Sequence, residues 1–261
     1  MEKVSYWRAM GEIEKLVKES IPGSHPKSWE VHALTQRLLL GLQSNLQGAP
    51  ITGFRSDFTV ECTALRRRPA EEAGAANGAA IAVVTRIANR DGTLLEGASF
   101  LEARIKSDRK RTFEAFTQPQ LRKSLRGSPS THLLLLDYED ITAYSSNRSV
   151  AFPAMEYSPW RGGLPVTPCT YAVVSPLNVV LAQHLNDTSL YRFSLPLSFQ
   201  LVYRYWHGFD LDPSEQALQA ARGFTSHREP CSYLLAMTVV EDGAEPPGAL
   251  ELERSAWRPL E

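Results

Sequence analysis

The stretch GAAIAVVTRIANRDGTLLEGASFLEARIK, residues 78–106, decides the fold that this chain is expected to adopt. An apolar run over 81–87 is followed by Asn-Arg-Asp-Gly at 89–92, and a second largely apolar run leads to Lys106. Asn, Asp and Gly between two such runs are typical of the turn of a β-hairpin. The stretch therefore predicts two antiparallel strands, the second over about 95–106.

The expected turn also determines which residues of the hairpin face each other. Paired residues of an antiparallel hairpin have numbers with a constant sum, which is about 182 for a turn at 90–92, so Ala80 is expected opposite Glu102 or within one residue of it. Side chains alternate between the two faces of a strand, which places Glu102, Arg104 and Lys106 together. Because burying charge is costly without a partner or a role, this face is the first place to look for function.

The rest of the chain alternates between helical and strand patterns. Helices are predicted at about 5–19, 28–46 (with Ser28 as N-cap), 112–126, 176–185, 195–206 and 213–222. Strands are predicted at 58–63, 133–138, 150–153 and 232–240, with a loop over 156–170 and a polar tail from 243. This alternation predicts an α/β fold, a central mixed β-sheet flanked by helices on both faces. We expect three parts: an N-terminal helix (1–27), a core (28–155) and a C-terminal extension of helices and a strand packed on that core (156–261).

Composition narrows the class of protein. The chain has 261 residues, 43% of them apolar and 22% charged, which is ordinary for a globular domain. Its three cysteines, Cys62, Cys169 and Cys231, lack the spacing of a zinc site or a disulfide framework, which favours a reducing compartment. The longest strongly apolar run is too short to cross a bilayer. We therefore expect a cytoplasmic protein without a membrane partner.

Charge is unevenly distributed although the net charge is only −1. Residues 101–126 contain eight basic and three acidic side chains, a net charge of +5. A basic stripe on a neutral protein is what a protein that binds the phosphate backbone can show, and a solvated charged surface is the alternative. The residues expected to contact nucleic acid are Arg109, Lys110, Arg111, Gln120, Arg122, Lys123 and Arg126.

Two short motifs in the hairpin resemble a known family. Gly78-Ala79-Ala80-Ile81 and Phe100-Leu101-Glu102-Ala103-Arg104 are similar to the motifs of the PD-(D/E)XK nuclease superfamily, which has the restriction-endonuclease-like fold. That family has an aspartate at the start of the first strand and Glu-x-Lys on the partner strand. In this chain the aspartate position is Ala80 and the lysine position is Arg104. The resemblance covers about 28–155.

The resemblance implies a site for Mg²⁺ or Mn²⁺ at positions 80 and 102, with Glu30 on the preceding helix as a further ligand. Hard cations of this kind prefer carboxylate oxygens, and they activate water for phosphodiester hydrolysis. Arg104 would bind phosphate, and Lys106, two residues further along the same face, would take over the role of the lysine. The implied function is a metal-dependent DNA endonuclease of a prokaryotic restriction or anti-phage system, acting with a partner subunit or as a homodimer.

Ala80 has no oxygen that could bind a metal, so this chain is expected to be inactive as a nuclease. Two explanations are open: an introduced substitution in a nuclease, which the well-preserved surroundings favour, or a naturally degenerate relative that binds nucleic acid or a partner protein. A third reading is an unrelated interaction protein whose charged strand face is an interface; it predicts no salt-dependent binding of DNA.

Overall fold

The computed structural model describes residues 4–53, 56–68, 79–108, 110–113, 117–141, 170–183, 185–224 and 230–260. Within these ranges the strands form a ten-stranded sheet. Nine of them follow the order β1-β2-β3-β9-β4-β5-β6-β7-β8, and β10 lies off this path and pairs with β3. The strands are β1 Val4–Ser5, β2 Ala49–Thr52, β3 Phe58–Arg67, β4 Ala79–Ala88, β5 Leu94–Ile105, β6 Thr131–Leu136, β7 Ala172–Pro176, β8 Leu195–Pro196, β9 Tyr233–Glu241 and β10 Trp257–Pro259.

The sheet is mixed, as predicted. β5 runs parallel to β6, and β9 runs parallel to β4, whereas β4 and β5 form the antiparallel hairpin and β3 and β9 are also antiparallel. β9 comes from the predicted C-terminal extension, yet it lies between β3 and β4 in the middle of the sheet. The residues after 156 therefore complete the central sheet instead of packing on the outside of a finished core.

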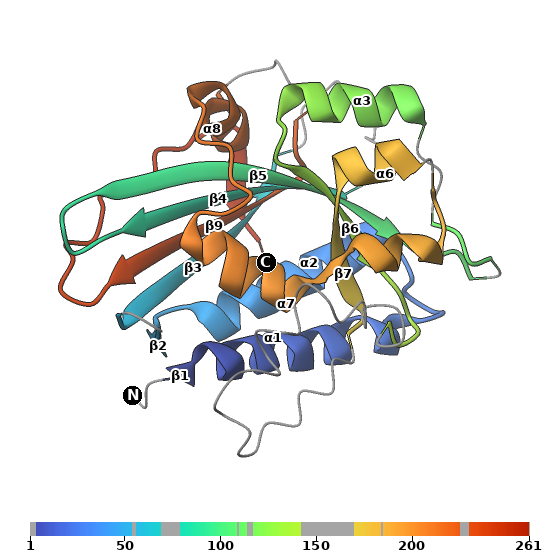
Figure 1. Ribbon diagram of the computed structural model, residues 1–261, viewed down its shortest axis with the longest axis horizontal. Coiled ribbons are helices and arrows are strands. Elements are labelled where there is room, and N and C mark those ends of the chain that lie inside the picture. Colours follow the sequence, from blue (N-terminus) through green and yellow to red (C-terminus); the bar gives the residue numbers. More distant parts are fainter. Residues whose placement is uncertain are drawn as a thin grey trace.

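Helices cover both faces of the sheet (Figure 1). α3, α6 and α8 lie on one face, and α1 and α2 lie on the other, where α7 packs against α1. Their bounds are α1 Tyr6–Ser20, α2 Val31–Leu46, α3 Gln118–Gly127, α6 Leu177–Gln183, α7 Leu197–Phe199 and α8 Glu215–Arg222. α7 continues into a π-helical turn, Gln200–Arg204, and a 3₁₀ turn, Tyr205–His207.

Three apolar clusters join these layers. The largest lies between the sheet and α1 and α2, and it includes Ile81 and Leu101 of the hairpin. A second lies under α8 and includes Ala82 and Phe100, and a third joins β6 and β7 to α3 and α6. Because neighbouring residues of the hairpin enter different clusters, both of its faces are buried, which explains its nearly continuous apolar sequence.

Most predicted elements are present, with shifted ends. α2 begins at Val31 with Glu30 as its N-cap, so Ser28 is not the cap. α3 begins at Gln118 and not near 112, because Thr117 caps it. The strand predicted at 150–153 lies outside the described residues. The strands that were not predicted are β1, β2, β7, β8 and β10; β8 lies where a helix was predicted, and β10 lies in the predicted polar tail.

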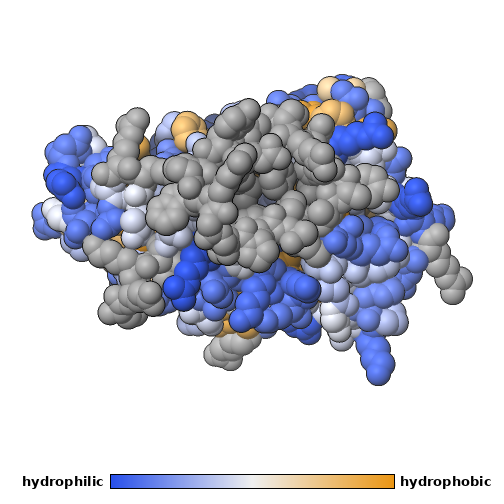
Figure 2. Space-filling model, turned by 60° about the horizontal axis from the view of Figure 1, so that its bottom comes forward, coloured by the Kyte–Doolittle hydropathy of each residue, from blue (hydrophilic) through white to orange (hydrophobic). Residues whose placement is uncertain are grey.

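Among the described helices none is long and apolar enough to span a bilayer. Figure 2 views the molecule from the side of α1 and α2, and the coloured part of that surface is mostly hydrophilic, with hydrophobic residues only in small separate places.

Candidate functional site

The central hairpin brings positions 80 and 102 together, as predicted. Ala80 pairs directly with Glu102 in the β4–β5 ladder. Ala80 packs against the cluster under α8, and so does Phe100, two residues before Glu102 on the same strand face. Ala80 and Glu102 therefore face the layer of α3, α6 and α8. Glu102 also pairs with Leu133 of β6, which contacts the α3 cluster.

Arg104 is held against Glu102 on this face. Its Nη2 donates to Oε2 of Glu102 at 3.3 Å, and its Nη1 donates to the carbonyl oxygen of Ala103 at 2.9 Å. The side chain of Arg104 is only 11% exposed and that of Glu102 only 13%. The guanidinium thus folds back along β5 toward Glu102, and the pair balances its own charge in a mostly buried place.

Lys106 was predicted on the same strand face as Glu102 and Arg104, and its hydrogen-bond partners lie outside this pair. Its ammonium group donates to Asp137 at 2.9 and 3.1 Å, and also to Glu139. It lies 4.5 Å from the ring centre of Tyr138. Burial by itself lowers the pKa of Lys106, but its hydrogen bonds to Glu139 and Asp137 raise it, and the net pKa is raised. Lys106 is therefore a permanently charged, structurally engaged side chain.

Asp137 and Glu139 are polar residues of this region that the sequence analysis did not select. Asp137 follows β6 directly, as Lys106 follows β5, and these strands are parallel and adjacent. Residues at the carboxyl ends of neighbouring parallel strands meet at one edge of a sheet, so an acid directly after the Leu-rich strand was a usable signal. Tyr191 also donates to Asp137 at 2.6 Å, and so does the backbone N–H of Glu139 at 2.8 Å.

The side chains present do not fit a divalent metal. Ala80 offers no ligand, and Arg104 already donates to Glu102. Glu30 is exposed at the start of α2, in the layer that covers the opposite face of the sheet. In the described part of the chain no group of three His, Cys, Asp or Glu side chains is placed to hold a metal ion. A hard cation needs several oxygens around it, and a single carboxylate that is already paired does not supply them.

The basic residues of α3 lie together on the same side of the molecule as Glu102. Arg122, Lys123 and Arg126 are exposed, and with Gln118 and Pro119 they line a hollow of about 420 Å³. α3 contains no acidic residue. Gln120, also expected to contact nucleic acid, accepts from the backbone N–H of Thr117 at 3.0 Å and so serves to cap the helix. Lys110 and Arg111 are exposed before α3, and Arg109 lies outside the described residues.

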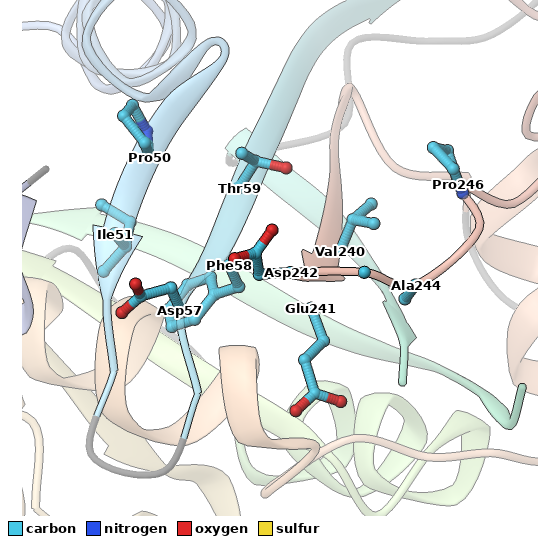
Figure 3. A pocket seen from close by; sticks show the side chains of 11 residues that line it. Pro50, Ile51, Asp57, Phe58, Thr59, Val240, Glu241, Asp242, Ala244 and Pro246 are labelled. Carbon is cyan, nitrogen blue, oxygen red and sulfur yellow. The ribbon is translucent and has the colours of Figure 1, made fainter. Parts of the chain in front are cut away.

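A second hollow, of about 320 Å³, has the opposite charge. It lies at the ends of β2, β3 and β9, where Asp57, Glu241 and Asp242 are among the lining side chains (Figure 3). Oε2 of Glu241 accepts from the backbone N–H of Arg90 at 2.7 Å, and this hydrogen bond lowers the pKa of Glu241. The acidic side chains that line this second hollow would repel phosphate, so the hollow at α3 is the better candidate for a nucleic-acid interface.

Comparisons with known proteins add no family. No family model matches the chain, and neither a curated protein nor a solved structure matches it significantly.

Proposed function

We propose that this protein binds nucleic acid, with DNA as the expected ligand, through the basic side of α3, and that it does not hydrolyse it. The observation that carries this proposal is which side chains occupy the paired positions 80 and 102 of the hairpin. Ala80 faces Glu102, and Glu102 is engaged by Arg104, so the pair of free carboxylates that metal-dependent hydrolysis needs is missing.

The binding part of the proposal is supported by charge and exposure on α3. Arg122 and Arg126 are four residues apart on one helix face, about 6 Å along the helix axis, and both are exposed. Arginine matches phosphate geometry with two parallel N–H donors. Contacts of this kind fix the position of the backbone and give little sequence preference.

The test is the salt dependence of DNA binding, measured by fluorescence anisotropy with a labelled 20-base-pair duplex. Each phosphate contact that is lost lowers the slope of log K against log salt by about 0.9. We expect the double variant Arg122→Gln/Arg126→Gln to lower that slope by nearly two. The matched control, Lys15→Gln/Lys18→Gln on the exposed side of α1, removes the same charge and should leave the slope unchanged.

Two results would count against the proposal. The first is DNA binding by the unaltered chain that does not depend on salt, or no binding at 50 mM salt. The second is cleavage of DNA by the unaltered chain when Mg²⁺ or Mn²⁺ is added.

A second candidate function is a metal-dependent nuclease whose site Ala80 has inactivated. The direct pairing of Ala80 with Glu102 favours it, because a carboxylate at position 80 would face a carboxylate at 102. This candidate predicts that Ala80→Asp alone gives Mg²⁺-dependent cleavage, which is lost again in Ala80→Asp/Glu102→Ala. The first proposal expects no cleavage by either variant.

A further inference from the structure

The site formed by Ala80 and Glu102 contains one carboxylate instead of two, but it does contain a cation, the guanidinium of Arg104. Arg104 lies two residues from Glu102 on the same strand face, and its guanidinium turns back to Glu102. An alanine at position 80 contributes only a methyl group on the facing strand. The negative charge of Glu102 is thus met by a side chain of the protein itself.

We propose that the guanidinium of Arg104 is the resident cation of the Ala80–Glu102 position, and that it keeps divalent metals from binding there. This inference rests on the non-hydrolytic function proposed above and concerns the same site. It makes Arg104 the residue that decides whether the position holds a metal, with Ala80 as the second requirement.

The chemistry of arginine supports a permanent role of this kind. A guanidinium carries a positive charge in proteins and presents its N–H donors in a fixed planar arrangement. A divalent ion that approached Glu102 would meet this charge at close range, in a mostly buried place where water screens poorly. It would also have to displace the hydrogen bond from Nη2 before it could reach Oε2.

Arg104 also retains donors for an anion. Two of its five N–H groups have protein acceptors, Ala103 and Glu102, and within the described residues the other three have none. These donors suit a phosphate oxygen, so the site should contact nucleic acid without the help of a metal.

The experiment measures Mn²⁺ binding to the purified full chain in the absence of nucleic acid. Free Mn²⁺ is followed by electron paramagnetic resonance for the unaltered chain, Ala80→Asp, Ala80→Asp/Arg104→Gln and the triple variant that adds Glu102→Gln. We expect the double variant to bind one Mn²⁺ saturably and at least about tenfold more tightly than Ala80→Asp alone, which corresponds to about 1.4 kcal/mol, and we expect no such binding by the unaltered chain. The triple variant should lose this binding, because one of the two carboxylates is gone.

Three outcomes would overturn the proposal: Ala80→Asp binds Mn²⁺ as tightly as the double variant, the unaltered chain binds one Mn²⁺ at this position, or the double variant binds none. Thermal unfolding of each variant checks that it is folded, and Ala80→Glu replaces Ala80→Asp in the series if the latter does not fold. Because no DNA is present, the outcome is independent of the anisotropy test. A chain that excludes Mn²⁺ but fails to bind DNA would contradict the proposed function alone.

Discussion

At the ends of β5 and β6, Asp137 is the buried carboxylate that balances the charge of the buried Lys106. It accepts from Lys106, from the hydroxyl of Tyr191 and from the backbone N–H of Glu139. The side chains of Lys106 and Asp137 are 4% and 3% exposed, so loss of Asp137 leaves the buried ammonium group of Lys106 with only the exposed carboxylate of Glu139 beside it. Breaking such a pair costs about 3–5 kcal/mol.

We expect Asp137→Asn to lower the free energy of unfolding by about 3 kcal/mol, measured by urea denaturation. The control is Glu139→Gln, which removes the other carboxylate that contacts Lys106. Because the side chain of Glu139 is 68% exposed, that change should cost less than about 1 kcal/mol. Equal effects of the two substitutions would show that burial of the Lys106–Asp137 pair is not what stabilises this edge.

At this scale the sequence predicts contacts within one hairpin better than contacts between distant strands. The pairing of Ala80 with Glu102 follows from turn chemistry only ten residues away, and it was predicted correctly. The partners of Lys106 were not predicted, because Asp137 is 31 residues further along the chain and reaches Lys106 only through the parallel pairing of β5 with β6. Such pairing depends on the whole sheet and leaves no local signal around Lys106 itself.

At the scale of elements, α1 and α7 meet through a carboxyl group. Glu14 of α1 accepts a hydrogen bond from the hydroxyl of Ser198 in α7, and its other oxygen is buried without a hydrogen-bond partner. Burial raises the pKa of Glu14 to about 7, and the hydrogen bonds from Ser198 and Thr170 oppose this only in part. The folded protein therefore holds the proton of the Glu14 carboxyl group more tightly than the unfolded chain does.

The consequence is a pH-dependent contribution to stability. A pKa that is higher in the folded state stabilises the protein below the ordinary pKa of glutamate, near 4.5, and that contribution is lost as the pH rises toward 7. We expect Glu14→Gln, which stays neutral, to be more stable than the unaltered chain at pH 8 by about 2 kcal/mol and to lose this advantage near pH 4.5. Urea denaturation at several pH values measures the free energy of unfolding of both proteins. Subtracting one from the other cancels the contributions of the histidines, which both proteins share. A difference that does not change with pH would contradict the assigned cause.

Elements with a strong local pattern were predicted, and short strands with proline were missed. α1 has a clear helical periodicity, and the β4–β5 hairpin has two apolar runs around a turn sequence, so the existence of both followed from the sequence. β2 contains Pro50 and β7 ends at Pro176, and proline inside a run argues against a strand. These strands form because neighbouring strands offer hydrogen bonds at their edges, for example β3 to β2 and β6 to β7. The start of α3 was misplaced, because the cap at Thr117 makes the helix begin at Gln118.

At the scale of the whole molecule, a strand from late in the sequence completes the middle of the sheet. β9 pairs with β3 on one side and with β4 on the other, so it links the N-terminal layer to the hairpin that carries Glu102. The division of the sequence into a core and an added extension fails here, because composition gives no sign that a late strand enters the middle of the sheet. The hairpin is held in place by residues more than 130 positions away.

This topology predicts that truncation at two nearby points has very different results. A chain that ends after Phe224 lacks β9 and leaves two long strand edges, β3 and β4, without partners. The apolar side chains of β9 are buried, and at about 2 kcal/mol each their loss removes roughly 10 kcal/mol, comparable with the total stability of a domain. A chain that ends after Asp242 keeps β9 and loses the tail with the short strand β10, including Trp257, whose indole N–H donates to the carbonyl oxygen of Arg222 in α8. We expect cooperative urea unfolding, with reduced stability, from the longer chain and none from the shorter one. Cooperative unfolding of the shorter chain would mean that residues 4–224 form a complete core, with β9 merely inserted between strands that can pair without it.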